Sequence, residues 1–243
     1  MEALKLPGFD GRTAVVTGGA RGIGLAIAQA LSAQGANVGI LDVRDAEDPG
    51  IDPERLVSQR CDITDEDSVD AAFTAVEERF GTVSILVNNA GILVTAPVDE
   101  MSLAEWQRSL DVNLTGSFLC IRRAVPGMRA QRYGRILSIG SSAGKSGGSG
   151  NMAAYAASKA GVMALARSVA SDHAAEGITS NALAPTLIET DMIAGLKDLA
   201  DRIPVRRLGT PDDVAYATLI LTSSLAGYIT GEITDVNGGW LID

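Results

Sequence analysis

The chain has 243 residues, of which 46% are hydrophobic, and 20 basic and 30 acidic side chains give it a formal net charge of -10. This length and apolar fraction suit one large domain, expected over residues 1–243. The acidic balance disfavours nucleic acid and anionic membranes as partners. No signal peptide and no run of about 18 apolar residues is present, so we expect a cytoplasmic protein.

Seven apolar, β-rich runs alternate with alanine-rich helical patterns. In chain order they are TAVVTG (13–18), ANVGILD (36–42), RLVSQRCD (55–62), VSILVNN (83–89), RILSIGS (135–141), ITSNALAP (178–185) and ITGEITDV (229–236). Such alternation is typical of parallel strands joined by crossover helices. We therefore predict an α/β fold, a doubly wound Rossmann-type parallel sheet of about seven strands with helices on both faces.

Local signals mark several boundaries. Ser102 with Glu105 is a capping-box pattern that predicts a helix start. Thr210, Pro211 and Asp213 predict another, because they supply a cap residue, a proline in the first turn and an acid near the positive helix end. Prolines and a glycine between Asp42 and Cys61 predict a loop or one short turn there. The glycine-rich stretch 144–153 is expected to be a connection.

The sequence offers no metal-binding pattern. Cys61 and Cys120 lack a CxxC spacing and are expected to be buried free thiols. His173, the single histidine, has no second histidine or clustered carboxylates at a ligand spacing. No metal site is predicted.

The segment TGGARGIGLAIAQAL (17–31) follows the first strand and opens an amphipathic helix. Gly18 permits the tight turn, Gly22 lets the main chain approach a pyrophosphate, and Gly24 lets the helix pack close to the strand. The phosphates would lie at the helix N-terminus. Asp42 ends the second strand, where a carboxylate accepts hydrogen bonds from the adenosine ribose hydroxyls of a dinucleotide.

Eight motifs occur in order along the chain: TGGARGIG, CDIT, NNAG, DVNLTG, SSAG, YAASK, NALAP and ETDM. Together they resemble the single-domain, classical type of the short-chain dehydrogenase/reductase family, over a span that begins at Asp10 and includes TGEITDVNGGW. The glycine spacing is the TGxxxGxG form of that family. The resemblance implies an oxidoreductase that uses a nicotinamide cofactor.

Tyr155 and Lys159 in YAASK lie one helical turn apart and therefore on one face. A nearby positive charge lowers the pKa of a tyrosine, as a general acid/base requires. The resemblance implies this role for Tyr155, and it implies that Lys159 lowers the tyrosine pKa and binds the nicotinamide ribose.

The resemblance also implies an asparagine that anchors a water-linked proton path and a serine that holds the substrate oxygen. Asn113 in DVNLTG matches the asparagine. Either Ser141 or Ser142 matches the serine: the S-x-x-G pattern selects Ser141, whereas the most frequent spacing to Tyr155 selects Ser142. We choose Ser141, because glycine-rich loops absorb insertions more readily than strand ends do.

The remaining cofactor contacts follow from the same matching. Asp62 and the Ile63 main chain are expected at the adenine, and Ile188 and Thr190 at the nicotinamide amide. Alternatively, Asn89 forms a strand-end turn and Thr190 caps a helix. One departure from the family pattern is Thr186, where glycine is usual. The full expected cofactor set is Gly18, Arg21, Gly22, Ile23, Gly24, Asp42, Asp62, Ile63, Asn89, Ala90, Gly91, Tyr155, Lys159, Ile188 and Thr190.

These patterns predict an NAD(H)-dependent enzyme that interconverts a secondary alcohol and a ketone. NAD is expected over NADP because Asp42 would repel a 2′-phosphate, although Arg21 and Arg44 are possible phosphate partners. The alternatives are an NADPH-dependent 3-oxoacyl-thioester reductase acting on acyl carrier protein and, in another class, a non-catalytic dinucleotide-binding regulator.

The expected substrate is a small polar molecule of the polyol, sugar or hydroxy acid type. Four acidic residues, expected at the mouth of the pocket, would repel an acidic carrier protein: Asp172, Glu176, Glu189 and Asp191. We also expect a homotetramer, since the helices after Ser102 and at Tyr155 are apolar or small around much of their circumference.

Overall fold

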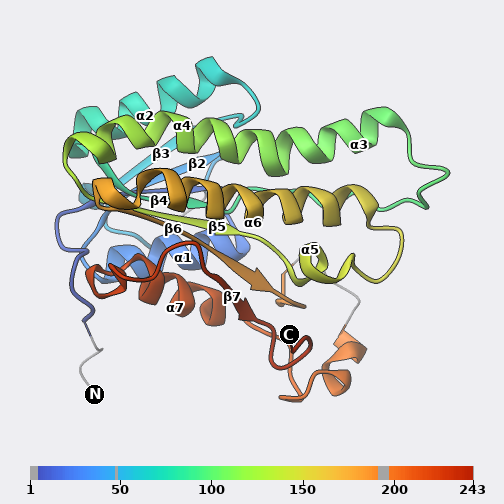
Figure 1. Cartoon of the computed structure of the whole chain (residues 1–243). Helices are drawn as coiled ribbons and strands as arrows, with labels where there is room; N and C mark the ends of the chain where they lie inside the picture. The colour runs from blue at the N-terminus through green and yellow to red at the C-terminus, as the bar shows by residue number, and fades with distance from the viewer. Residues whose placement is uncertain (1–4, 47–48, 191–196, 243) are drawn as a thin grey trace.

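The protein folds around one seven-stranded sheet (Figure 1). The computed structural model describes residues 5–46, 49–190 and 197–242. The strands are β1 (Thr13–Thr17), β2 (Asn37–Asp42), β3 (Leu56–Arg60), β4 (Val83–Asn88), β5 (Gly134–Ile139), β6 (Ile178–Pro185) and β7 (Ile233–Val236). All adjacent pairs are parallel, in the order β3-β2-β1-β4-β5-β6-β7. The predicted doubly wound α/β fold is confirmed.

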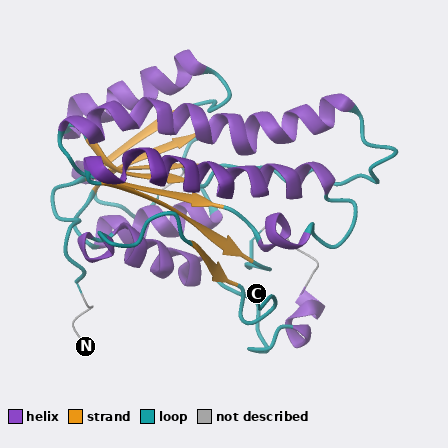
Figure 2. Cartoon of the chain, viewed as in Figure 1, coloured by secondary structure: helices purple, strands orange, loops and turns teal. Residues whose placement is uncertain are grey.

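Helices cover both faces of the sheet (Figures 1 and 2). One face packs against α1 (Gly22–Ala33) and α7 (Pro211–Thr222), and the other against α2 (Glu66–Phe80), α4 (Gly116–Ala130) and α6 (Ala153–His173). Successive strand residues point to opposite faces, so Ile40 joins the first core and Leu41 the second. None of the described helices is long and apolar enough to cross a membrane.

The predicted boundaries agree with the structure. Ser102 and Glu105 form a capping box at the start of α3 (Leu103–Leu110), and Thr210 and Asp213 form another at α7. The connection from β2 to β3 contains one short 3-10 turn, Pro53–Arg55. Cys61 and Cys120 are buried free thiols, as expected.

The glycine-rich connection after β5 contains a helix that the sequence did not predict. This helix, α5 (Ser142–Ser146), is one and a half turns long. Ser141 caps it, because its Oγ accepts a hydrogen bond from the Ala143 N–H at 3.1 Å, and Gly147 ends it in a left-handed conformation with φ of 85°. Serine capping and a terminal glycine thus stabilise a helix despite the glycine content.

A single π-helical turn, Asp111–Thr115, joins α3 to α4. The extra residue in this turn changes the direction of the side chains that follow. Asn113 lies at its centre and is fully buried. The turn therefore directs an asparagine toward the interior beside the ends of the central strands.

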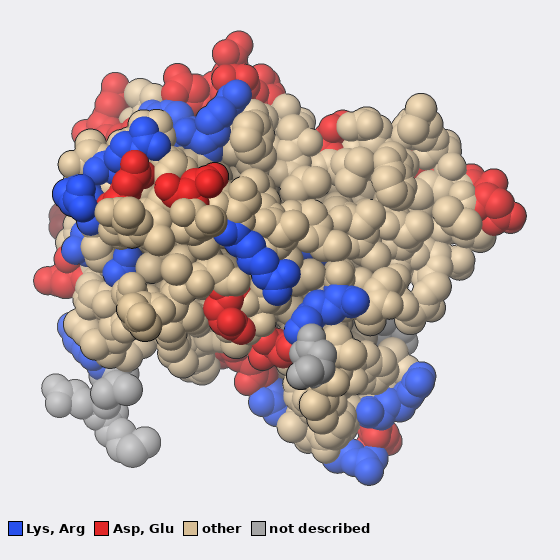
Figure 3. All heavy atoms as spheres, in the orientation of Figure 1, with Lys and Arg blue, Asp and Glu red and all other residues tan. Residues whose placement is uncertain are grey.

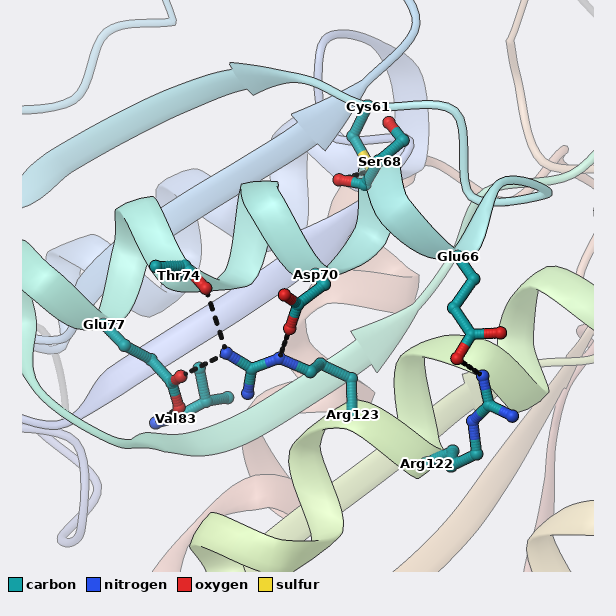
Figure 4. A network of polar contacts seen from close by, with 9 residues as sticks. All are labelled: Cys61, Glu66, Ser68, Asp70, Thr74, Glu77, Val83, Arg122 and Arg123. Atoms are coloured by element: carbon teal, nitrogen blue, oxygen red, sulfur yellow. Dashed lines mark hydrogen bonds and ion pairs between the residues drawn. The ribbon is translucent and has the colours of Figure 1, made fainter.

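An arginine network joins α2 to α4 (Figure 4). The Arg123 guanidinium forms ion pairs with Asp70 at 2.6 Å and with Glu77 at 2.8 Å, while only 27% of its side chain is exposed. The neighbouring Arg122 pairs with Glu66, but these side chains are 47% and 69% exposed. A shared, half-buried guanidinium with two acceptors is the more stabilising arrangement, since exposed pairs contribute little.

Replacing Arg123 should therefore destabilise the protein more than replacing Arg122. We expect Arg123→Ala to lower the free energy of unfolding by about 1–2 kcal/mol and Arg122→Ala by about 0.5 kcal/mol or less. Urea denaturation of both variants measures this difference. Equal decreases in the free energy of unfolding would contradict the conclusion that the Arg123 ion pairs stabilise the protein more than the Arg122 pair.

Candidate active site

A cleft of about 1630 Å³ lies along the carboxyl ends of the strands. The chain order reverses between β1 and β4, and ligands of open α/β sheets bind at such a point. The loops after β1, β2, β3, β4, β5 and β6 all contribute to its lining. Of the predicted site residues, Gly24 and Asn113 lie outside this lining, and the others belong to it.

The glycine turn after β1 brings α1 close to the sheet. Gly18 has φ of 63°, and a Cβ on it would lie 2.7 Å from the Ala90 Cα. A Cβ on Gly24 would collide with the Gly18 carbonyl oxygen. The N-cap residue of α1 is Arg21, whose donor-only side chain cannot cap the first turn, and the main-chain N–H groups of such a helix start favour an anion. This arrangement fits a dinucleotide pyrophosphate.

Asn89 and Thr17 hold this turn in place. The Asn89 side-chain amide donates to the Thr17 and Gly18 carbonyls at 3.0 and 2.9 Å. The Thr17 hydroxyl accepts from the Asn89 and Ala90 N–H groups, each at 3.1 Å. The Asn89 side chain therefore stabilises a turn, as the alternative structural role for this residue predicts. Thr17 was missed, although it opens the quoted TGGARGIG motif.

Two aspartates lie on the adenosine side of the cleft. Asp42 ends β2, and its two carboxylate oxygens accept from the Ala20 N–H at 3.0 Å and the Arg44 N–H at 3.1 Å. Asp62 accepts from the Thr64 N–H at 2.9 Å and from its hydroxyl at 2.7 Å. Asp62 is held by its own loop, whereas Asp42 is held by its own loop and by the glycine turn after β1, and its negative charge lies at the cleft wall.

Tyr155 and Ser141 meet at the centre of the cleft. A hydrogen bond with Ser141 lowers the pKa of Tyr155, but burial has the larger effect and raises the pKa above its ordinary value. The expected lowering by Lys159 is therefore not the net result in this structure. It is Ser141 that bonds to the tyrosine; Ser142 begins α5, and its carbonyl accepts from the Ser146 hydroxyl.

Lys159 lies behind the tyrosine and is 4% exposed. Its Nζ donates to the Ile139 carbonyl at 2.7 Å and lies 5.9 Å from the centroid of the Tyr155 ring. Burial lowers the pKa of Lys159 from 10.5 to about 8, because the charged form loses hydration. An ammonium behind a phenol, with a hydroxyl partner in front, is an arrangement that polarises a carbonyl oxygen and exchanges a proton with it.

Asn113 supports this group from behind the cleft wall. Its amide bonds both main-chain groups of Ile92, accepting from N–H at 2.8 Å and donating to C=O at 3.0 Å. It also donates to the Ser158 hydroxyl at 2.9 Å, which in turn donates to the Tyr155 carbonyl at 2.7 Å. Ser158 lies inside the quoted YAASK motif, and sequence reasoning assigned it no role.

The segment after β6 forms the nicotinamide side of the expected site. Thr186 is buried, and its N–H donates to the Val236 carbonyl at 3.2 Å. Leu187 adopts a left-handed φ of 49°, which is strained for this residue type. Ile188 pairs with Gly209, and the Thr190 hydroxyl donates to the Ile188 carbonyl at 3.3 Å. The departure at Thr186 thus coincides with an unusual backbone at the next residue.

A further part of the cleft wall, on α3 and at Trp240, was not predicted from the sequence. Gln107 and Arg108 contribute from α3, and Trp240 contributes from the C-terminal segment. Arg202 of the 3-10 turn Lys197–Arg202 lies over the Trp240 ring, 5.7 Å from its centroid. Gln107 and Arg108 precede the DVNLTG motif and Trp240 ends the TGEITDVNGGW stretch, but the motifs assigned them no role and the fold brings them to the cleft.

The predicted acidic rim is partly wrong. Asp172 belongs to the last turn of α6, and Glu176 follows in a 3-10 turn that leads into the amino end of β6. In a parallel sheet the amino ends lie opposite the cleft, and Glu176 pairs there with Arg129 at 2.9 Å. Glu189 does line the cleft, whereas Asp191 lies outside the described residues. Two of the four residues expected to repel an acidic carrier protein therefore lie away from the cleft.

Two arginines that follow the 3-10 turn Lys197–Arg202 bond to groups nearby in the chain. Arg207 pairs with Asp213 at 2.6 Å, and this pairing holds the pKa of the aspartate below its ordinary value. Arg206 donates to the Asp201 carbonyl at 2.6 Å. Two other arginines, Arg108 and Arg202, line the cleft outside the loops that would bind the cofactor, and both are exposed.

The comparisons with known proteins agree on one family. The family model described as Enoyl-(Acyl carrier protein) reductase matches residues 18–241. The 3-oxoacyl-[acyl-carrier-protein] reductase MabA of Mycobacterium tuberculosis (strain ATCC 25618 / H37Rv) is 43% identical over 238 residues, covering 96% of this chain and 94% of that protein. FabG of Escherichia coli (strain K12), with the same described activity, is 38% identical, with coverages of 95% and 98%.

Other relatives differ in the activity that their names state. The cis-4-hydroxycyclohexanecarboxylate dehydrogenase of Sinomonas cyclohexanicum is 40% identical, covering 96% of this chain and 97% of that protein. The crystal structure of gox2181 superposes with a TM-score of 0.91 at 37% identity, covering 95% and 96% of the two chains. Fold, motifs and relatives therefore agree: the chain belongs to the short-chain dehydrogenase/reductase family of oxidoreductases, which act on CH–OH groups with a nicotinamide dinucleotide.

Proposed function

We propose that the protein is a 3-oxoacyl-thioester reductase, which converts the 3-oxo group of an acyl chain into a 3-hydroxy group. The observation that carries this proposal is the hydrogen-bonded pair of Ser141 and Tyr155 in the cleft, with Lys159 buried behind it. The names of the two 3-oxoacyl reductases described above support the substrate class. In this proposal the whole chain, 1–243, acts as one dinucleotide-binding domain.

Each residue of the pair has a task at the carbonyl oxygen. The bound nicotinamide supplies the hydride to the carbonyl carbon. The Ser141 hydroxyl orients the oxygen, and Tyr155 donates its phenolic proton to the alkoxide that develops. Lys159 places a positive charge behind the phenol and binds the nicotinamide ribose, while Asn113 fixes the loop at Ile92 beside it. The remaining cofactor contacts are those predicted from the sequence.

The relatives favour the thioester over the small polar substrate that the sequence analysis ranked first. Two of the four acidic residues behind that ranking lie at the opposite edge of the sheet, so charge at the mouth opposes an acyl carrier less than expected. A hydroxy acid remains the second candidate. It is favoured by the cleft cations Arg108 and Arg202, which suit a carboxylate, and by the named activity of the Sinomonas relative.

A direct comparison of substrates separates the two candidates. We expect kcat/KM for acetoacetyl-CoA reduction to exceed that for oxidation of cis-4-hydroxycyclohexanecarboxylate and of short hydroxy acids or polyols by about tenfold or more. Absorbance of the reduced cofactor reports both directions. Faster oxidation of the hydroxy acids would replace the first candidate by the second, and no turnover of any substrate would favour a binding protein without catalysis.

We propose NAD(H) as the preferred cofactor. The Asp42 carboxylate is held at the cleft wall by the Ala20 and Arg44 N–H groups, so it cannot easily turn away from a 2′-phosphate. Repulsion between two anions in a partly enclosed cleft disfavours NADP(H). Arg21 and Arg44 line the same region and oppose this effect.

Replacing Asp42 tests the cofactor assignment. The ratio of kcat/KM for NADH to that for NADPH should exceed about ten in the wild type and fall about tenfold or more in Asp42→Ala. Asp45→Ala is the matched control: it removes an exposed charge from the same loop, outside the cleft lining, and should leave the ratio nearly unchanged. A wild-type preference for NADPH would overturn the proposal.

We also propose a homotetramer in which α4 and α6 contribute to one interface. Phe118 on α4 is 43% exposed, and Leu103 at the start of α3 is 79% exposed. Alanines such as Ala157 and Ala164 occupy exposed positions of α6. Figure 3 shows few charged side chains over much of the face formed by α3 and α6. Molar mass from light scattering measures this state directly.

The proposed role of Lys159 requires a buried ammonium, and burial has a measurable consequence for stability. Because its pKa is about 8 in the fold against an ordinary 10.5, the unfolded chain binds more protons between these values. Stability of the cofactor-free wild type should therefore rise relative to Lys159→Met as pH rises from about 8 to about 10.5, by about 1–3 kcal/mol. Urea denaturation at both pH values checks this, and a constant difference would show that the ammonium is solvated.

A further inference from the structure

The short helix α5 carries the active-site serine. Ser141 is its N-cap, bound to the Ala143 N–H at 3.1 Å, and the same side chain bonds to Tyr155. One side of α5 touches α6, since a Cβ on Gly144 would lie 2.7 Å from the Ala160 nitrogen. The position of the serine relative to the tyrosine is therefore set by how α5 sits against α6.

A helix of five residues has little stability of its own and depends on contacts with the rest of the protein. Lys145 supplies one such contact, from the side of α5 toward β7. Its Nζ lies 2.6 Å from Oδ2 of Asp235 in β7. The side chains are only 17% and 24% exposed, so solvent screens this pair less than most surface pairs.

The Asp235 carboxylate has one main partner. Its second oxygen, Oδ1, is buried and accepts no hydrogen bond from the described residues. Asp235 itself is held by the sheet, because β7 pairs with β6 and Asp235 is in register with Ala184. The ion pair thus joins a marginal helix to a fixed strand across 90 residues of sequence. Neither partner lines the cleft.

We propose that the Lys145–Asp235 ion pair is a positioning device for Ser141: it holds α5 between β7 and α6, so that the serine hydroxyl stays bonded to Tyr155. The inference rests on the proposed function, which gives Ser141 its work at the carbonyl oxygen. Lys145 and Asp235 act only through the serine. Loss of the pair should therefore affect the chemical step and leave dinucleotide binding intact.

The test uses Asp235→Asn, which keeps the shape of the side chain, and Lys145→Met. The substrate is whichever compound the wild type turns over fastest. We expect either variant to lower kcat about tenfold, since a small displacement of a positioned group has effects of this size or greater, while the Kd for the reduced cofactor changes less than about twofold. The double variant should be no worse than either single variant, because the two residues act as a unit.

A second background separates positioning from a general loss of stability. In Ser141→Ala the serine hydroxyl is already absent, so adding Asp235→Asn should lower kcat no further. Glu176→Gln is the matched control: it breaks the Arg129–Glu176 pair, whose atoms are 2.9 Å apart at the opposite edge of the sheet, and should leave kcat unchanged even if the melting temperature falls.

The outcomes are distinguishable. Unchanged kcat in both Asp235→Asn and Lys145→Met, or the same loss from Asp235→Asn with and without Ser141, would overturn the positioning role alone. Full kcat in Ser141→Ala would instead overturn the proposed part of the serine in catalysis, and the ion-pair inference would fall with it.

Discussion

The buried ammonium group of Lys159 constrains most of the cleft. A charge removed from water must be hydrogen-bonded or lose its proton, and here the Ile139 carbonyl accepts from it at 2.7 Å while the pKa still falls to about 8. That contact requires β5 to end beside α6. A Cβ placed on Gly91 would lie 3.2 Å from both the Lys159 Nζ and the Asn113 Oδ1, so the loop after β4 passes close to the same point.

The strand order extends this local arrangement into a site for two ligands. With β1 and β4 adjacent, the glycine turn and the NNAG loop lie side by side and share the hydrogen bonds of Asn89 and Thr17. Asp42 defines the far end of the cleft on one side of this junction. Ser141 and Tyr155 lie on the other side, where α5 and α6 start, and form the proposed reacting end. In the proposed function, the cofactor and the substrate therefore meet above β4 and β5.

Much of this could be predicted because its determinants are local in sequence. The alternation of strands and helices, the capping boxes at Ser102 and Thr210, and the YxxxK spacing each follow from short-range rules, and the structure agrees on the elements. The family motifs then placed most of the candidate residues on one cleft. The helix α5 escaped prediction because glycine content outweighed the cap at Ser141.

Asp172 and Glu176 precede the predicted strand 178–185, so the predicted parallel sheet already places them at its amino edge, and expecting them at the pocket mouth was inconsistent with that sheet. The other missed features depend on contacts between distant residues. The direction of the Tyr155 pKa depends on burial, which motif spacing does not reveal, and so the expected lowering was wrong for this structure. Trp240 ends the TGEITDVNGGW stretch, but it reaches the cleft only through the packing of the C-terminal segment.

The account depends most on Tyr155 as the proton donor, and one variant tests that directly. Tyr155→Phe keeps the ring and removes the hydroxyl; Tyr216→Phe, at a position 63% exposed on α7, controls for the substitution itself. With the best substrate, the account predicts a loss of about a hundredfold or more in kcat for Tyr155→Phe, a Kd for the cofactor near that of the wild type, and no change for the control. A Tyr155→Phe enzyme that kept more than about a tenth of wild-type kcat would contradict it.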